Sequence, residues 1–298
     1  MQPLSDPPIV TRFFSPAPAL LPYVSTYYLS EVNLPKGARA VDWLHPEWAN
    51  LRFFKGGTPV ASVGTSEAIS VPRFTIAGPT SYATRFETGT MRLWGIGLLP
   101  LGWARLIGAS AGQYADRFVD GDSDPAGKMF RALHKQLLGA EAARGAEEAA
   151  KIDAYLLPLF EQAPPDDPAI LAAHAALTDP DIASVAELAE RLGLSERSVE
   201  RLSQRAFGFP PKLLLRRQRF LRTLAHVMLD PSQRWVRSLD PQYHDQAHFA
   251  RDFKRFMGMS AKAYMAQPHP FLGAAVHGRM AMAGAAMQAL HRPDTPEG

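Results

Sequence analysis

The chain of 298 residues contains no cysteine. This absence excludes a disulfide framework, a thiolate zinc site, an iron–sulfur cluster and a cysteine nucleophile. The chain also lacks any run of roughly 18 to 20 uncharged apolar residues, the length that a membrane helix needs. Its first 30 residues lack the basic segment and apolar core of a secretory leader. We therefore expect a cytoplasmic protein.

Catalytic and cofactor motifs are equally scarce. Neither standard glycine-rich phosphate loop is present. Residues 1–120 contain His45 as their only histidine, which argues against the transition-metal centre of a cupin-type enzyme. Residues 108–112 match the spelling of a hydrolase nucleophile elbow, but that motif needs a preceding strand and residues 102–107 favour a helix. We therefore expect that the protein is not an enzyme and that it binds no metal and no cofactor.

What the chain does have is an uneven distribution of charge. Its 32 Lys and Arg residues against 29 Asp and Glu residues give a net charge of +3. Residues 191–264 contain 15 basic and 6 acidic side chains, a net charge of +9, so the remainder carries −6. This asymmetry favours a nucleic-acid face on one domain, although a solvated basic helical surface would give the same count.

Composition also divides the chain along its length. Between residues 23 and 99, β-branched and aromatic side chains alternate with Gly and Pro turns, which predicts strands at 23–29, 50–54, 60–63, 74–77 and 91–96. Several short strands at even spacing favour a small antiparallel barrel or sandwich. Residues 102–108 predict a short helix, and residues 124–162 have helical apolar spacing that ends at a proline-rich stretch, 164–168.

We therefore predict an α+β protein of four parts. Residues 1–120 form a small β-barrel or sandwich, cupin-like in its dimensions, and residues 121–165 form a helical linker that could also serve as a dimer contact. Residues 166–268 form an all-α domain. Residues 269–298 form a tail rich in Ala and Met, for which the sequence indicates no role.

Residues 184–202 have the pattern of a helix-turn-helix motif. Ser184 can cap a first helix, and Glu187, three residues later, can complete a capping box. Gly193 can adopt the left-handed conformation that ends this helix, and Ser195 can cap the next one. Apolar residues fall on one face of each helix, as the motif requires.

The second of these helices carries polar side chains on the side away from its apolar stripe, among them Arg197, Glu200 and Arg201. The planar guanidinium of arginine donates two parallel hydrogen bonds to a guanine edge or a phosphate, and a glutamate can accept from cytosine. This arrangement favours contact with base edges. For Glu200, pairing with either arginine along the helix surface is the alternative.

A less regular version of the motif follows at residues 240–257. Asp240-Pro241 breaks the chain, and a helix beginning near Gln246 has Phe249, Phe253 and Phe256 as its apolar stripe. A long helix at residues 211–229, which carries four arginines, joins the two units. The sequence therefore predicts two helix-turn-helix units in one domain.

Residues 169–265 resemble the DNA-binding domain of the AraC/XylS family of bacterial transcription regulators. The likeness rests on Leu188-Ala189, on Gly193-Leu194-Ser195, on residues 207–211 and on the run DQAHFARDFKRFMGMSAKAY at 245–264, which is similar to the closing signature of the family. Two positions depart from that pattern. Gln242-Tyr243 stands where the family has Gly-Phe, so the second turn must be built differently, and Ala261 stands where the family has proline.

The resemblance implies a sequence-specific transcription regulator whose two recognition helices enter successive major-groove segments of double-stranded DNA. It implies that Ser195 and Lys254 hold phosphates. His248 lies beside Phe249, and for it we expect a structural role. RNA polymerase and a second copy of the chain are further partners that the resemblance allows. Base contacts fall to six residues, three on each recognition helix: Arg197, Glu200, Arg201, Gln246, Ala250 and Arg251.

The first domain resembles the divergent β-rich sensor domains of the same family, which bind a small effector, mediate dimerisation, or both. Four aromatic side chains could line an effector pocket, although core packing is the alternative at strand spacing: Trp43, Trp48, Phe53 and Trp94. Arginines 52, 85 and 92 alternate with apolar neighbours on candidate strands. Outward is their expected orientation, but one that faces inward would favour an anionic effector.

An alternative function belongs to a different class. The chain could be a ligand-binding or protein-interaction module whose degenerate second helix-turn-helix no longer binds DNA. Salt-dependent DNA binding separates the two, because phosphate contacts release counterions.

Overall fold

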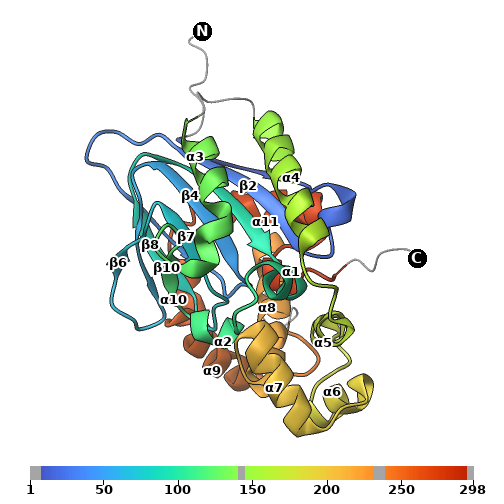
Figure 1. Ribbon diagram of the computed structural model, residues 1–298. Helices are drawn as coiled ribbons and strands as arrows, with labels where there is room; N and C mark the ends of the chain where they lie inside the picture. The colour runs from blue at the N-terminus through green and yellow to red at the C-terminus, as the bar shows by residue number, and fades with distance from the viewer. Residues whose placement is uncertain (1–7, 140–144, 231–238, 294–298) are drawn as a thin grey trace.

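The computed structural model describes residues 8–139, 145–230 and 239–293. The N-terminal part of the chain is built mainly from strands, and the C-terminal part is helical (Figure 1). This confirms the predicted α+β class. No helix in the described ranges is long and apolar enough to cross a membrane.

Two separate antiparallel sheets form the β-rich part. The six-stranded sheet has the order β1 (Ile9–Phe14), β2 (Val24–Val32), β9 (Met91–Leu98), β4 (Asn50–Gly56), β7 (Phe74–Ala77) and β10 (Phe118–Asp120). The four-stranded sheet has the order β3 (Ala40–Leu44), β8 (Thr84–Thr88), β5 (Val60–Val63) and β6 (Ile69–Ser70). No strand ladder closes the two sheets into a barrel within the described residues, so the sandwich alternative is the correct one.

All five predicted strands are present, as β2, β4, β5, β7 and β9. The other five strands were not predicted. Most of them are short or sit at a sheet edge, where polar and half-buried residues weaken the period-two pattern that marks a strand. β1 is an example, because its six residues are all at least partly exposed.

Alternation along the strands gives the six-stranded sheet two different buried faces. On β4, Leu51 and Phe53 point to one face, and Arg52 and Phe54 point to the other. The first face is covered by α3 (Arg131–Gly139) and α4 (Gly145–Gln162), so the helices predicted as a linker pack on the sheet. Tyr27 donates a hydrogen bond to Asp153 of α4 at 2.8 Å, which fixes this helix.

The sheets lead into the helical part through two short helices, α1 (Pro100–Leu106) and α2 (Ala111–Tyr114). Pro100 stands at the first turn of α1, where its missing N–H costs nothing. Residues 108–112, the spelling of a nucleophile elbow, therefore follow a helix and not a strand. That placement removes the geometric basis for a nucleophile on a sharp strand-to-helix turn.

Six helices are present in the described part of the predicted all-α domain. They are α5 (Pro168–Thr178), α6 (Val185–Leu192), α7 (Glu196–Phe207), α8 (Pro211–Leu229), α9 (Gln246–Met257) and α10 (Ala261–Met265). Figure 1 shows α6, α7 and α9 together at the bottom of the view, below the strands. The predicted helix at 211–229 coincides with α8, whose apolar side chains form much of this domain's core.

The tail returns to the first domain. It forms α11 (Leu272–Ala283) and a short 3₁₀ turn, η4 (Gln288–Leu290), and α11 packs against β1, β3 and α8. Asp42 of β3 is fully buried and accepts hydrogen bonds from the backbone N–H groups of Phe271 (3.0 Å) and Leu272 (2.9 Å) at the start of α11. A carboxylate in this position satisfies helix N–H groups that have no partner within the helix. Residues 271–290 are thus packed against the sandwich.

Candidate nucleic-acid interface and effector cavity

The first helix-turn-helix unit has the caps that its sequence predicts. The Ser184 hydroxyl accepts from the Glu187 backbone N–H at 3.2 Å, and the Glu187 carboxylate accepts from the Ser184 N–H at 3.0 Å, which completes the capping box. Gly193 ends α6 with a φ of 62°, and the Ser195 hydroxyl accepts from the Ser198 N–H to begin α7. These local bonds fix the angle between α6 and α7.

One face of α7 is exposed to solvent. Arg197, Glu200 and Arg201 are all exposed, whereas Val199 and Leu202 on the opposite side are buried. No ion pair within the described residues joins Glu200 to either arginine, so pairing along the helix surface does not occupy them. All three side chains are open to a partner in solution.

The second unit replaces the family's Gly-Phe turn with a turn organised by Asp240. Its backbone carbonyl accepts from the Tyr243 N–H at 2.9 Å, and its carboxylate accepts from the Gln242 N–H at 3.0 Å and from Arg222 at 2.5 Å. Asp240 is therefore what allows the departure at Gln242-Tyr243. The first helix that a helix-turn-helix unit requires before this turn would fall largely in residues 231–238, which lie outside the described residues.

The second recognition helix, α9, also begins at a predicted cap. The Asp245 carboxylate accepts from the His248 backbone N–H at 2.6 Å. Phe249, Phe253 and Phe256 are buried as predicted. The four side chains assigned to DNA on this helix are all exposed: Gln246, Ala250, Arg251 and Lys254. Ala261 starts α10 under a cap by Ser260, so the missing proline costs the helix nothing visible.

Asp252 holds the second unit together, and sequence reasoning did not single it out. Its carboxylate is fully buried and accepts from Arg216 at 2.5 Å, Arg219 at 3.1 Å and the Tyr243 hydroxyl at 2.9 Å. It therefore joins α9 to α8 and to the turn. Its place within the predicted apolar stripe, one residue before Phe253, was the only signal.

His248 has the structural surroundings expected of it. Its ring packs edge-on against Tyr243, with centroids 5.1 Å apart, and its Nε2 lies 3.1 Å from a guanidinium nitrogen of Arg219. Burial, reinforced by the Arg219 charge, lowers the pKa of His248. The neutral ring therefore belongs to the packing of this unit.

The four arginines of α8 contribute little to the exposed basic surface. Arg216 and Arg219 pair with Asp252, and Arg222 pairs with Asp240. Arg217 is fully buried. Much of the +9 counted along this segment is thus internal, and the basic surface available to DNA comes mainly from α7 and α9.

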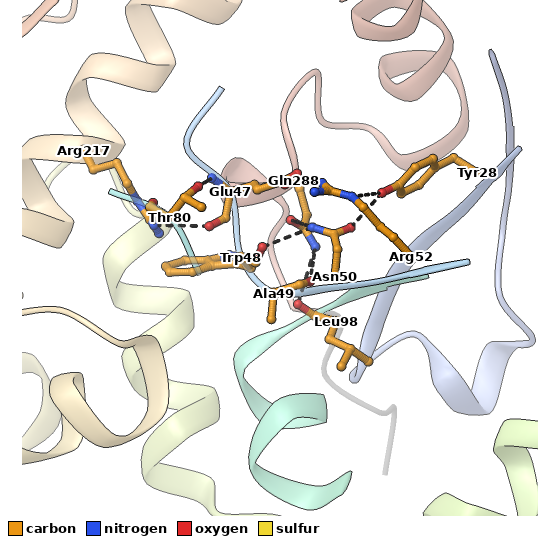
Figure 2. A network of polar contacts seen from close by, with 10 residues as sticks. All are labelled: Tyr28, Glu47, Trp48, Ala49, Asn50, Arg52, Thr80, Leu98, Arg217 and Gln288. Atoms are coloured by element: carbon orange, nitrogen blue, oxygen red, sulfur yellow. Dashed lines mark hydrogen bonds and ion pairs between the residues drawn. The ribbon is translucent and has the colours of Figure 1, made fainter. Parts of the chain in front are cut away.

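Arg217 reaches from α8 into the first domain. Its guanidinium lies over the Trp48 ring, 4.0 Å from the centroid, and donates to the Thr80 carbonyl at 2.8 Å (Figure 2). Burial lowers the pKa of Arg217 to about 9, which leaves it charged at neutral pH. A buried cation over a tryptophan is a strong contact. It ties the helix that joins the two helix-turn-helix units to the sandwich.

Both recognition helices also touch the first domain at their C-terminal ends. Phe207 of α7 packs edge-on against Trp48, with centroids 5.6 Å apart. The backbone N–H of Ala83 donates to the Phe256 carbonyl of α9 at 2.7 Å. The sandwich is therefore in contact with both parts of the candidate interface.

A cavity of about 160 Å³ lies between the two sheets and α11. Its walls are mostly apolar, with Phe54 and Leu93 from the six-stranded sheet, Phe86 from the four-stranded sheet, and Phe271 and Val276 from the tail. Such a concave, largely apolar space with a few polar groups is typical of a small-molecule site. The α11 residues make the tail one wall of it.

One end of the cavity is polar and contains two buried arginines. Arg52 pairs with Glu47 and donates to the Tyr28 hydroxyl at 2.9 Å, as Figure 2 shows. Arg279 of α11 lines the same cavity. Asn50 and Gln288 bond each other beside them at 3.2 Å. The expected outward orientation is therefore wrong for Arg52, which faces inward. Arg85 is exposed, and Arg92 pairs with Glu148 of α4.

The four aromatic residues proposed for an effector pocket lie elsewhere. Trp48 is at the junction with α7 and α8, Phe53 stacks on Phe74 under α3, Trp94 packs against Phe14, and Trp43 meets His269. None is among the residues that line the cavity. The residues that do line it include Arg279, which is the only Lys, Arg, Asp or Glu residue in the largely apolar stretch 271–290, and that isolation was a signal in the sequence.

Comparison with known proteins supports the helical part. A family model described as a helix-turn-helix domain matches residues 188–267. No curated protein matches the chain.

Among solved structures, ToxT from Vibrio cholerae is similar at 8% identity over 76% of this chain and 97% of that one, with a TM-score of 0.46. ToxT from strain O395 bound to (E)-4-(8-methylnaphthalen-1-yl)but-3-enoic acid is similar at 9% identity over 86% and 98%, with a TM-score of 0.45. The AraC-like transcriptional activator CuxR is similar at 13% identity over 74% and 88%, with a TM-score of 0.26.

The family match and the two capped helix-turn-helix units agree on the same residues. Residues 188–267 are a helix-turn-helix domain of the AraC type, and the protein is a DNA-binding transcriptional regulator.

Proposed function

We propose that α7 and α9 of this regulator bind successive major-groove segments of one operator, and that a small effector in the cavity adjusts this binding. The observation that carries the proposal is the exposure of eight side chains on two capped helices: Arg197, Glu200, Arg201, Gln246, Ala250, Arg251, Ser195 and Lys254. Their opposite faces are buried, so the orientation of each helix is fixed.

The attachment of both recognition helices to α8 supports binding as one unit. α9 is held on α8 through Arg216, Arg219 and Phe220, and α7 packs on the same helix. Successive major-groove segments are roughly 34 Å apart, so the two recognition helices would enter them with a fixed relative position.

We assign different work to two sets of residues. Arg197, Glu200, Arg201, Gln246, Ala250 and Arg251 contact base edges and so select the sequence. Ser195 and Lys254 contact phosphates and fix the register. RNA polymerase and a second copy of the chain remain further proposed partners, because the helix-turn-helix domain implies only the DNA.

The effector part of the proposal rests on three contacts between the cavity and the DNA-binding domain. His45 lines the cavity, and its Nε2 lies 2.8 Å from the hydroxyl of Tyr264 in α10. Glu47 also lines it, and the carbonyls of Glu47 and Thr80 face Arg217 of α8. The third contact is covalent, since α11 follows α10 directly. A molecule that moves these walls shifts the domain that holds α7 and α9.

Anisotropy with labelled fragments of the protein's own promoter region tests the DNA part. Specific fragments should bind more tightly than random DNA, and the logarithm of affinity should fall steeply with the logarithm of salt concentration. Equal affinity for specific and random fragments at moderate salt would favour the interaction-module alternative.

Two substitutions separate the assigned roles. Arg201→Ala should lose about 1 to 3 kcal/mol of discrimination between cognate and random DNA, whereas Lys254→Ala should weaken both about equally. Arg85→Ala, an exposed arginine on the sandwich, is the matched control and should change neither. Equal losses on both DNAs from Arg201→Ala would remove its base-reading role.

A further inference from the structure

The charges around the cavity do not balance. Arg52, Arg279 and Glu47 line it, and Glu47 forms an ion pair with Arg52. His45, at the same end, is neutral because burial lowers its pKa to about 3. The lining therefore carries one positive charge more than it has carboxylates to match.

Arg279 is the source of that excess. Its side chain is buried, with only 7% of the residue exposed. One terminal nitrogen donates to the Thr26 hydroxyl at 2.6 Å, while Nε and the other terminal nitrogen have no hydrogen-bond partner in the part of the chain that the structure describes. Among the described residues, no carboxylate lies within ion-pair distance of it. Burial lowers the pKa of Arg279 to about 10, so the group is charged at neutral pH.

Such a group is costly unless something else compensates it. A buried charge without a partner destabilises a fold, and buried polar groups are almost always satisfied. The free edge of a guanidinium offers two parallel N–H donors, a geometry that a carboxylate matches with its two oxygens. The missing partner thus has the charge and shape of a carboxylate.

The rest of the cavity specifies what the carboxylate is attached to. Its remaining walls are mostly aliphatic and aromatic, with Phe54, Phe86, Met91 and Val276 among them. A cavity of about 160 Å³ compares with one of roughly 150 Å³ that accepts a benzene ring. The body of the ligand is therefore apolar and has about the size of one ring or a short alkyl chain.

We propose that this cavity binds a small organic monocarboxylate, with its carboxylate on Arg279 of the C-terminal helix and its apolar body between the two sheets. The inference rests on the proposed function in one respect, since it names the class of effector. The ligand contacts two distant segments of the chain. The sheets belong to the first domain, and Arg279 belongs to the segment after the second helix-turn-helix unit.

This arrangement gives the tail a role. Asp42 of β3 accepts hydrogen bonds from the first turn of α11. Gln288 of η4 donates to the carbonyl of Ala49, the residue just before β4, at 3.1 Å. The tail is thus attached to the sandwich on both sides of Arg279. A carboxylate on Arg279 adds a third attachment, and it stiffens the connection between α10 and the sandwich.

Thermal melting of the full-length protein tests the proposal with defined probes. Phenylacetate and hexanoate at about 10 mM should raise the Tm by about 3 °C or more. Their neutral counterparts, phenylacetamide and hexanamide, should not, since they have the same apolar bodies without the charge. Equal shifts from acid and amide, or no shift from either acid, would overturn the assignment.

Variants of Arg279 identify the group that binds the carboxylate. Arg279→Met should weaken the binding of phenylacetate, measured by calorimetry, about 10- to 100-fold, and Arg279→Lys should restore part of it. Without ligand, Arg279→Met should melt no lower than the wild type, because it removes an unpartnered buried charge. A Met variant that keeps the wild-type affinity, or that melts well below the wild type, would mean that Arg279 is a structural residue.

Arg292→Met serves as the matched control. It removes an exposed arginine from the same tail and should change neither the Tm nor the affinity. The anisotropy assay on promoter DNA, run without probe, separates the two proposals. Salt-dependent specific DNA binding with no carboxylate effect would leave the regulator in place and remove this site, whereas carboxylate binding without DNA binding would do the reverse.

Discussion

Replacing Asp252 by asparagine tests whether the second helix-turn-helix unit is held by the contacts described here. Asparagine keeps the size of the side chain and one oxygen acceptor but removes the charge. The two arginines of α8 that pair with Asp252 would then lose this ion pair, and one of the three acceptor contacts of its carboxylate would be lost or reversed.

The magnitude follows from the burial of each partner. Breaking a buried ion pair by removing one charge costs about 3 to 5 kcal/mol. Arg216 is 37% exposed, so solvent screens its share, whereas Arg219 is 15% exposed and Asp252 is fully buried. We therefore expect a loss of about 3 kcal/mol, near the lower bound. For a chain of 298 residues that corresponds to a fall in Tm of about 5 °C.

Chemical denaturation measures the stability, and anisotropy measures the DNA affinity. Glu200→Gln is the matched control, because it makes the same acid-to-amide change on the exposed face of α7 and should alter stability by less than about 0.5 kcal/mol.

The expected change in DNA affinity is the opposite of what a simple charge count predicts. Removing a negative charge from a DNA-binding domain would by itself strengthen DNA binding, yet we expect Asp252→Asn to weaken it because α9 loses its attachment to α8. A stable Asp252→Asn protein that binds DNA more tightly would refute this account.

Three further predictions use other parts of the structure. Gly208→Ala should cost more stability than Gly193→Ala, since both have a positive φ but only at Gly208 would a Cβ meet Pro79, at 2.7 Å; equal losses would mean that α7 does not press on the sandwich. His45→Gln should flatten the dependence of stability on pH. Burial lowers the pKa of His45 in the folded protein to about 3, so below about pH 6.5 the unfolded chain binds a proton that the folded protein does not. The free energy of unfolding of the wild type therefore falls by about 1.4 kcal/mol per pH unit as the pH decreases from about 6.5 towards 3; denaturation at pH 4, 5 and 7 measures this. Arg217→Met should leave cognate DNA affinity within about threefold while abolishing any effect of the carboxylate probes on it, since it removes the cation from the junction with Trp48; unchanged coupling in anisotropy would exclude this route.

Local signals made the first helix-turn-helix unit predictable. Ser184, Glu187, Gly193 and Ser195 act through bonds to residues at most five positions away, so the sequence alone contains both partners. The same holds for the phenylalanine stripe of α9. What could be predicted in detail is what is decided within one or two helical turns.

The cavity could not be predicted in this way, because its walls come from residues far apart in the chain. Arg52 and Arg279 are separated by more than two hundred positions, and nothing local indicates that both face one space. The aromatic residues proposed for the pocket were reasonable by type, but aromatic side chains at strand spacing serve core and cavity alike. Strand pairing decides which face they occupy.

The arginines of α8 show why a correct charge count does not predict which basic residues are available to DNA. Arg216, Arg217, Arg219 and Arg222 follow one another along a single helix and are equal contributors to a basic segment. In the structure, three pair with acidic residues of the second unit and the fourth enters the sandwich. These side chains therefore set the positions of α9 and of the first domain relative to α8. Because a buried charge must be compensated wherever it lies, the helix that supports the second unit also fixes how the first domain is attached, and under the proposed function a ligand that changes the charge balance of the cavity would act on that attachment.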